Sequence, residues 1–145
     1  MATLTSIINQ TPHNGRFKKL EQAWHLNNSG WIPPGQIRPT DISFPWVHTL
    51  KEFIDKVLII ELLGKIRFYV WEADGILYVS QTDQPGAVTP YLEEEPTAEE
   101  DPFIDADPQL FYRPQIAKGD YKAQEKWIYI RHYGKSFELV FKKPS

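Results

Sequence analysis

The side chains that could do chemistry in this chain are four histidines, a set of serines and a dense group of carboxylates. His13, His25, His48 and His132 show neither HxH nor HExxH spacing, so they do not predict a zinc site. A nucleophilic triad needs a serine or cysteine beside a histidine–carboxylate pair. Cysteine is absent, no serine lies in a Gly-x-Ser-x-Gly turn, and no Gly-rich phosphate loop occurs. We therefore expect a protein that is not an enzyme and that holds no cofactor and no metal.

The carboxylates are concentrated in one segment, with nine acidic residues and no basic one between residues 83 and 112. Their mutual repulsion, together with the prolines that interrupt them, favours an acidic, proline-rich surface loop over residues 83–109. The spacing lacks the order of an EF-hand loop, so it predicts no specific calcium site. The segment is either a solvated loop or an arm that binds a basic partner. The residues of that candidate arm are Glu93, Glu94, Glu95, Glu99, Glu100 and Asp101.

Two other stretches place aromatic rings and cations on alternate residues. Such a face suits a protein–protein interface, where aromatic residues and arginine are enriched. It also suits single-stranded nucleic acid, which binds stacking rings and cations. Alternatively, these side chains form a second buried layer. The candidate binding residues are Arg67, Tyr69, Trp71 and Tyr78 in the first stretch and Trp127, Tyr129, Arg131 and Tyr133 in the second.

The elements that must position these residues are two predicted β-hairpins. In residues 65–81, Asp74-Gly75 is a strong two-residue turn signal, which puts Trp71 opposite Tyr78. In residues 127–141 the turn at Gly134 puts Arg131 opposite Glu138, and the agreement of charge supports that register. The opposite face of the second hairpin carries Ile128, Ile130, His132, Phe137, Leu139 and Phe141. We expect this face to point into the core, with His132 as a hydrogen-bonded structural residue.

The first half of the chain predicts the elements that cover the sheet. Residues 16–26 carry an apolar stripe at helical spacing, and residues 48–56 carry a clearer one behind the capping residue Thr49. Residues 57–63 predict a strand, although the helix could instead continue to Gly64. The proline-rich stretch 31–46 predicts an irregular strap across the core, and residues 3–8 an edge strand or ordered tail.

The totals fit one domain over residues 1–145, with 41% hydrophobic and 14% aromatic residues. We expect an α+β fold, with a mainly antiparallel, twisted sheet or small open barrel of about five or six strands under one or two short helices. No apolar run is long enough to predict a membrane span, and we expect a cytoplasmic location. The predicted function is that of an adaptor or regulator that binds another protein. The alternative is a single-stranded nucleic-acid-binding domain.

Overall fold

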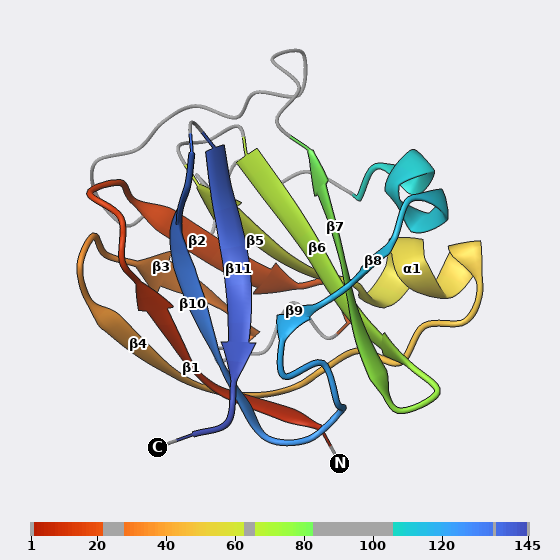
Figure 1. The fold of residues 1–145 in the computed structure, drawn as a ribbon. Helices are drawn as coiled ribbons and strands as arrows, with labels where there is room; N and C mark the ends of the chain where they lie inside the picture. The colour runs from red at the N-terminus through yellow and green to blue at the C-terminus, as the bar shows by residue number, and fades with distance from the viewer. Residues whose placement is uncertain (1, 22–27, 63–65, 83–105, 135, 145) are drawn as a thin grey trace.

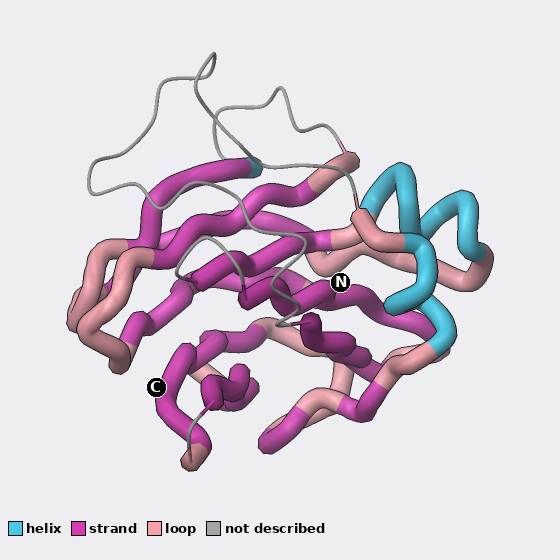
Figure 2. The backbone as a smooth tube through the Cα atoms, turned by 90° about the horizontal axis from the view of Figure 1, so that it is seen from above, coloured by secondary structure: helices cyan, strands magenta, loops and turns pink. Residues whose placement is uncertain are grey.

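The computed structural model describes residues 2–21, 28–62, 66–82, 106–134 and 136–144. Its strands form two sheets, which lie as two layers with both helices at one side (Figure 2). Sheet A contains, in spatial order, β4 (Ile37–Ser43), β1 (Thr3–Asn9), β10 (Lys126–Tyr133), β11 (Ser136–Lys142) and β9 (Lys118–Gly119). Sheet B contains β3 (Ser29–Ile32), β2 (Gly15–Lys19), β5 (Leu58–Leu62), β6 (Ile66–Ala73), β7 (Ile76–Thr82) and β8 (Gln115–Ile116).

This architecture confirms the predicted fold class. Most neighbouring strands are antiparallel, and the two sheets enclose the main core between them. Ile128, Ile130 and Phe141 contribute to this core from sheet A, while Phe68 and Val70 contribute from sheet B. Chain connections close the structure at two corners, because β3 leads into β4 and β8 leads into β9 (Figure 1). The result is a flattened, open barrel.

The central hairpin has the predicted register. Trp71 lies opposite Tyr78 along β6 and β7. The two turn residues, Asp74 and Gly75, have φ angles of 54° and 80°, as a two-residue turn with left-handed residues requires. Two aromatic and β-branched runs around Asp-Gly were therefore sufficient to locate this hairpin.

The C-terminal hairpin also has the predicted register. Arg131 lies opposite Glu138, and Ile130 lies opposite Leu139. Gly134 in the turn has a φ angle of 60°, a conformation that favours glycine. Ile128 and Ile130 face the core as expected.

The helix and strand expected over residues 48–63 are also confirmed. Helix α1 (Leu50–Lys56) begins after Thr49, whose hydroxyl accepts a hydrogen bond from the backbone N–H of Glu52. The chain then enters β5, in which every residue is buried. Burial on both faces explains why β5 is almost continuously apolar.

The helix predicted over residues 16–26 is wrong in the part that the structure describes. Residues 15–19 form β2, which pairs with β3 on one side and with β5 on the other. Phe17 faces the core, while the neighbouring Arg16 points to the opposite face and pairs with Glu61. This alternation and two ladders of backbone hydrogen bonds outweigh a short helical stripe. Residues 22–27 lie outside the described part of the chain.

The irregular strap predicted over residues 31–46 is also wrong. It contains the end of β3 and all of β4, joined by a turn in which Gly35 has a φ angle of 68°. Pro39 fits within β4 because β4 is an edge strand, where a missing N–H removes no hydrogen bond from the sheet. By contrast, β1 is not an edge strand but lies between β4 and β10, and it is parallel to β10.

The 3-10 helix η3 (Pro108–Tyr112) lies at the end of the predicted acidic loop. Asp107 caps it by accepting a hydrogen bond from the N–H of Gln109, and Leu110 is buried. Residues 106–109 are therefore ordered here, whereas residues 83–105 lie outside the described part. Among the described residues, no helix is long and apolar enough to cross a bilayer.

Candidate binding surface

The structure divides the eight predicted binding residues between two environments. Arg67, Tyr69 and Trp71 have exposed fractions of 2%, 0% and 3%, and Tyr78 is half-buried. They lie on the face of sheet B that points away from the main core. This first group is therefore the buried layer that we had considered as the alternative, and we do not include it in the proposed binding surface.

Helix α1 and η3 cover this first group (Figure 1). The ring of Phe53 in α1 lies 5.1 Å from the ring of Trp71 and 5.7 Å from that of Tyr69, centroid to centroid. Leu110 from η3 belongs to the same cluster. Burial raises the pKa of the Tyr69 phenol above its ordinary value, so this hydroxyl stays neutral.

Arg67 belongs to a row of charged residues across three strands of sheet B. Arg16 in β2 lies opposite Glu61 in β5, and Glu61 lies opposite Arg67 in β6. The Arg67 Nε atom is 2.9 Å from Glu61 Oε2, while Arg16 Nη2 contacts Glu61 Oε1. All three side chains are buried. This row of ion pairs links β2, β5 and β6, and it engages Arg67 through its Nε atom.

The second group lies on the outer face of sheet A. Because Ile128 and Ile130 point inward, the alternating residues Trp127, Tyr129 and Arg131 point outward. These three are half-buried, and Tyr133 at the end of the strand is 64% exposed. In Figure 1, β10 and β11 lie in front of sheet B, and neither α1 nor η3 crosses them. The rings of this group are therefore available at the surface.

Tyr129 lies at the middle of a row that spans all five strands of sheet A. The pairing runs from Ile37 to Ile8, from Ile8 to Tyr129, from Tyr129 to Val140 and from Val140 to Lys118. We call these five residues the Tyr129 row. Ile37 is 58% exposed at one end, and Lys118 is exposed at the other. Ile8 and Val140 are buried, with exposed fractions of 9% and 5%, so the accessible apolar part of the row is Ile37 and the half-buried Tyr129. Lys118 adds a cation at the end of the row, and no helix of the described residues covers this face.

Two lysines lie over the tyrosine rings of this face. Lys142 Nζ is 4.9 Å from the centroid of Tyr129, and Lys118 Nζ is 4.5 Å from that of Tyr133. Both distances are within the range of cation–π attraction. Each lysine therefore covers one ring face, while the ammonium group stays near the surface.

Glu138 neutralises part of the positive charge on this face. Its carboxylate accepts from Arg131 Nε at 3.0 Å and from Lys118 Nζ at 2.5 Å. Desolvation raises the pKa of Glu138, but these two hydrogen bonds outweigh it, so its pKa lies below the ordinary value. The carboxylate stays ionised and fixes both cations in place.

The sequence alone did not reveal Lys118, Ile8 or Ile37 as members of this face. Lys118 is brought there by the two-residue strand β9, and Ile8 by the parallel pairing of β1 with β10. Both contacts join residues more than 20 positions apart, and no local pattern encodes them. Residues 3–8 predicted an edge strand or ordered tail, but the strand that pairs with Ile8 could not be identified from the sequence.

The histidines do not form a metal-binding cluster in the described part of the chain. No group of three metal-ligating side chains is present there. His132 is exposed rather than buried, which corrects the expected core position. It lies beside the β10–β11 turn, where its ring packs at 4.7 Å from Phe137 and 6.3 Å from His13. His132 is on the same side of β10 as the buried Ile128 and Ile130, but it lies near the end of the strand, where the core no longer covers it.

The candidate acidic arm is the remaining predicted site. Its residues, Glu93, Glu94, Glu95, Glu99, Glu100 and Asp101, lie outside the part of the chain that the structure describes. The arm therefore stays a prediction.

Comparison with known protein families, with curated proteins and with solved structures finds no match for this chain. The functional argument therefore depends on the geometry of the outer face of sheet A.

Proposed function

We propose that this chain is a non-catalytic interaction protein, an adaptor or regulator that binds another protein through the outer face of sheet A. The observation that carries the proposal is the Tyr129 row with its aromatic neighbours Trp127 and Tyr133, on a face that no helix of the described residues covers. Ile37 and Tyr133 are exposed here, and Trp127 and Tyr129 are half-buried. Partly exposed apolar and aromatic side chains gathered on one face mark interaction sites in globular proteins. The proposal includes a cytoplasmic location, supported by the complete lack of cysteine.

The composition of the face supports a protein partner. Tyrosine, tryptophan and arginine are the residue types that dominate binding energy in protein interfaces. Here Trp127, Tyr129, Arg131 and Tyr133 occupy alternate positions of a single strand, β10. Glu138 holds Arg131 in one orientation, which reduces the entropy that the side chain loses on binding.

The same geometry argues against single-stranded nucleic acid as the main partner. Base stacking requires free ring faces, but lysines lie over Tyr129 and Tyr133. Phosphate binding requires uncommitted cations, and Glu138 pairs with both Lys118 and Arg131. An apolar surface on a protein partner can bind this face without free ring faces and without uncommitted cations.

The experiment is a comparison of two double variants in affinity capture with quantitative mass spectrometry. The first is Trp127→Ala with Tyr129→Ala. The control is Trp46→Ala with Tyr112→Ala, which removes an exposed tryptophan and an exposed tyrosine outside sheet A. We expect the wild type and the control to capture a common protein, and we expect the first variant to capture at least tenfold less of that protein.

A fluorescence titration distinguishes the two partner classes. We expect oligo(dT) and oligo(U) at low salt to leave the tryptophan emission unchanged. Quenching that weakens steeply with salt would instead identify a nucleic-acid-binding face. Equal capture by both double variants would contradict a role of this face in protein binding.

A further inference from the structure

The corner between β7 and β11 is filled by a single extended segment of the chain. Residues Gln115 and Ile116 pair antiparallel with β7, and the same segment then pairs parallel with β11 at Lys118 and Gly119. Sheets A and B are thus joined here by one strand that changes partner.

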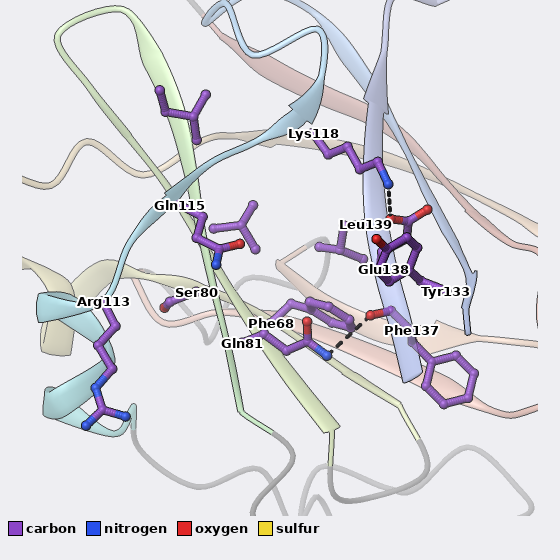
Figure 3. Close-up of a pocket in the computed structure, with 12 residues that line it drawn as sticks. Phe68, Ser80, Gln81, Arg113, Gln115, Lys118, Tyr133, Phe137, Glu138 and Leu139 are labelled. Carbon is purple, nitrogen blue, oxygen red and sulfur yellow. Dashed lines mark hydrogen bonds and ion pairs between the residues drawn. The ribbon is translucent and has the colours of Figure 1, made fainter. Parts of the chain in front are cut away.

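Next to this segment, the corner is open. A cleft of about 470 Å³ lies between β7 and β11 (Figure 3). Its volume is within the range of small ligand sites. The lining combines apolar side chains, among them Phe68, Val79 and Leu139, with polar ones, among them Arg113 and Gln115. Gln115, Ile116 and Lys118 of the segment that fills the corner also line the cleft.

Both walls of this cleft are strand edges with backbone groups directed into it. Leu77 hydrogen-bonds through its N–H and C=O to residues on the β8 side. Backbone direction alternates along a strand, so Gln81, four residues on, points its groups the same way. Likewise, the carbonyl of Phe141 accepts from Asp120 N, so Phe137 also faces the cleft. The pairing of β7 with β8 stops at Val79, and the pairing of β11 with β9 starts at Val140. Gln81 and Phe137 therefore lie beyond both pairings.

A side-chain amide already occupies this position. Gln81 Nε2 donates to the backbone carbonyl of Phe137 at 3.3 Å (Figure 3). It also lies 3.4 Å from Ser136 Oγ. A glutamine amide has the same donor chemistry as a peptide N–H. The Gln81 side chain therefore makes the contact that the next residue of a bound strand would make.

We propose that the cleft between β7 and β11 is a docking site for an extended acidic peptide that adds as a strand, parallel to β11 and antiparallel to β7. Edge strands with unpaired backbone groups accept peptides in this way. The preference for acidic side chains follows from the rim. Arg113 is exposed, and its guanidinium has no hydrogen bond or ion pair with the described residues, while Lys118 and Glu138 compensate one another.

The site differs from the surface of the proposed function. That surface is the outer face of sheet A around Tyr129, whereas the cleft lies at the sheet's edge. The two share Lys118, Tyr133 and Glu138 at their common margin, but Trp127 and Tyr129 do not line the cleft. The two proposals can therefore fail separately.

The test is an NMR titration of the full chain with a capped pentapeptide that alternates valine and glutamate. We expect the backbone amides of Gln81 and Phe137 to shift and to gain protection from hydrogen exchange. Two matched peptides serve as controls, one N-methylated at alternate residues and one with glutamine in place of glutamate. The N-methylated peptide should not bind, because it cannot donate to a strand edge, and the neutral peptide should bind two- to fivefold more weakly.

Variants sharpen the result. Gln81→Val removes the internal competitor at an exposed position and should strengthen peptide binding roughly three- to tenfold. Arg113→Ala should weaken it roughly two- to fivefold, and Tyr129→Ala should leave it unchanged. Unshifted Gln81 and Phe137 amides at millimolar peptide would overturn the proposal. So would equal binding of the N-methylated peptide, whereas equal binding of the neutral peptide would overturn the acidic preference.

Discussion

Glu61 lies directly opposite Arg67 in adjacent strands, with Oε2 2.9 Å from Nε and both side chains at most 2% exposed. Arg16 contacts the other carboxylate oxygen of Glu61. On this buried face of sheet B, the ion pairs therefore join residues that are directly opposite one another in β2, β5 and β6. Glu61 is the only charged residue of β5. Because it contacts both Arg16 and Arg67, its removal takes an ionic partner from two arginines at once.

We predict that Glu61→Gln, which keeps the volume but removes the charge, destabilises the protein by about 3–5 kcal/mol. Removing one partner of a buried ion pair leaves the other charge uncompensated. The matched control is Glu138→Gln on the exposed pairs with Arg131 and Lys118, for which we expect about 1 kcal/mol or less. Urea unfolding measures both, and equal losses would contradict a structural role for the Glu61 contacts.

The contribution of Glu138 should depend on pH. Its pKa in the folded protein is below the ordinary value of 4.5, so the unfolded chain binds a proton more readily than the folded one. The stabilisation is present above about pH 4.5 and is lost as the pH falls through the folded-state pKa. We expect the stability difference between wild type and Glu138→Gln to shrink in that acidic window. A difference that is constant from pH 7 to pH 3 would disprove this.

Helix α1 should depend on one side chain. Phe53 is fully buried against Tyr69 and Trp71, so Phe53→Ala should cost about 3–5 kcal/mol. Its neighbour Ile54 is 36% exposed, and Ile54→Ala should cost about 1 kcal/mol or less. Thermal unfolding followed by circular dichroism compares the two, and a comparable loss at both positions would show that α1 is not anchored through Phe53.

Two glycines with left-handed backbones should respond differently to alanine. Gly75 has open space where a Cβ would lie, so Gly75→Ala costs only the backbone strain of about 1–2 kcal/mol. A Cβ on Gly119 would lie 2.3 Å from the Phe141 carbonyl oxygen, so Gly119→Ala should cost more and separate β9 from β11. Hydrogen exchange at Asp120 N–H reports that separation. Unchanged protection there would contradict the predicted clash.

The elements that the sequence predicted correctly are those whose partner is adjacent along the chain. Asp74-Gly75 fixes which residues of β6 and β7 are opposite, and the charges of Arg131 and Glu138 agree with the second turn. Helix α1 carries its own cap and apolar stripe. Local chemistry specifies these pieces completely.

The elements that it missed depend on distant partners. Strand β2 has a helical stripe of its own but becomes a strand because β3 and β5 pair with both of its edges. The neighbour of Ile8 is Tyr129, which is 121 positions away in a parallel pair. For the same reason, sequence could not separate the buried Tyr69 from the accessible Tyr129. The two have equivalent local patterns, and only the placement of α1 and η3 over sheet B distinguishes them.

The central claim is that the outer face of sheet A binds a protein, and site-specific photo-crosslinking tests it most directly. A photoreactive phenylalanine analogue replaces Tyr129 in one sample and Tyr112, which is 68% exposed on η3, in the other. We predict that the probe at position 129 forms a discrete adduct with another protein in native extract, and that excess unlabelled wild type abolishes it. No adduct at position 129, or the same adducts from both positions, would contradict the claim.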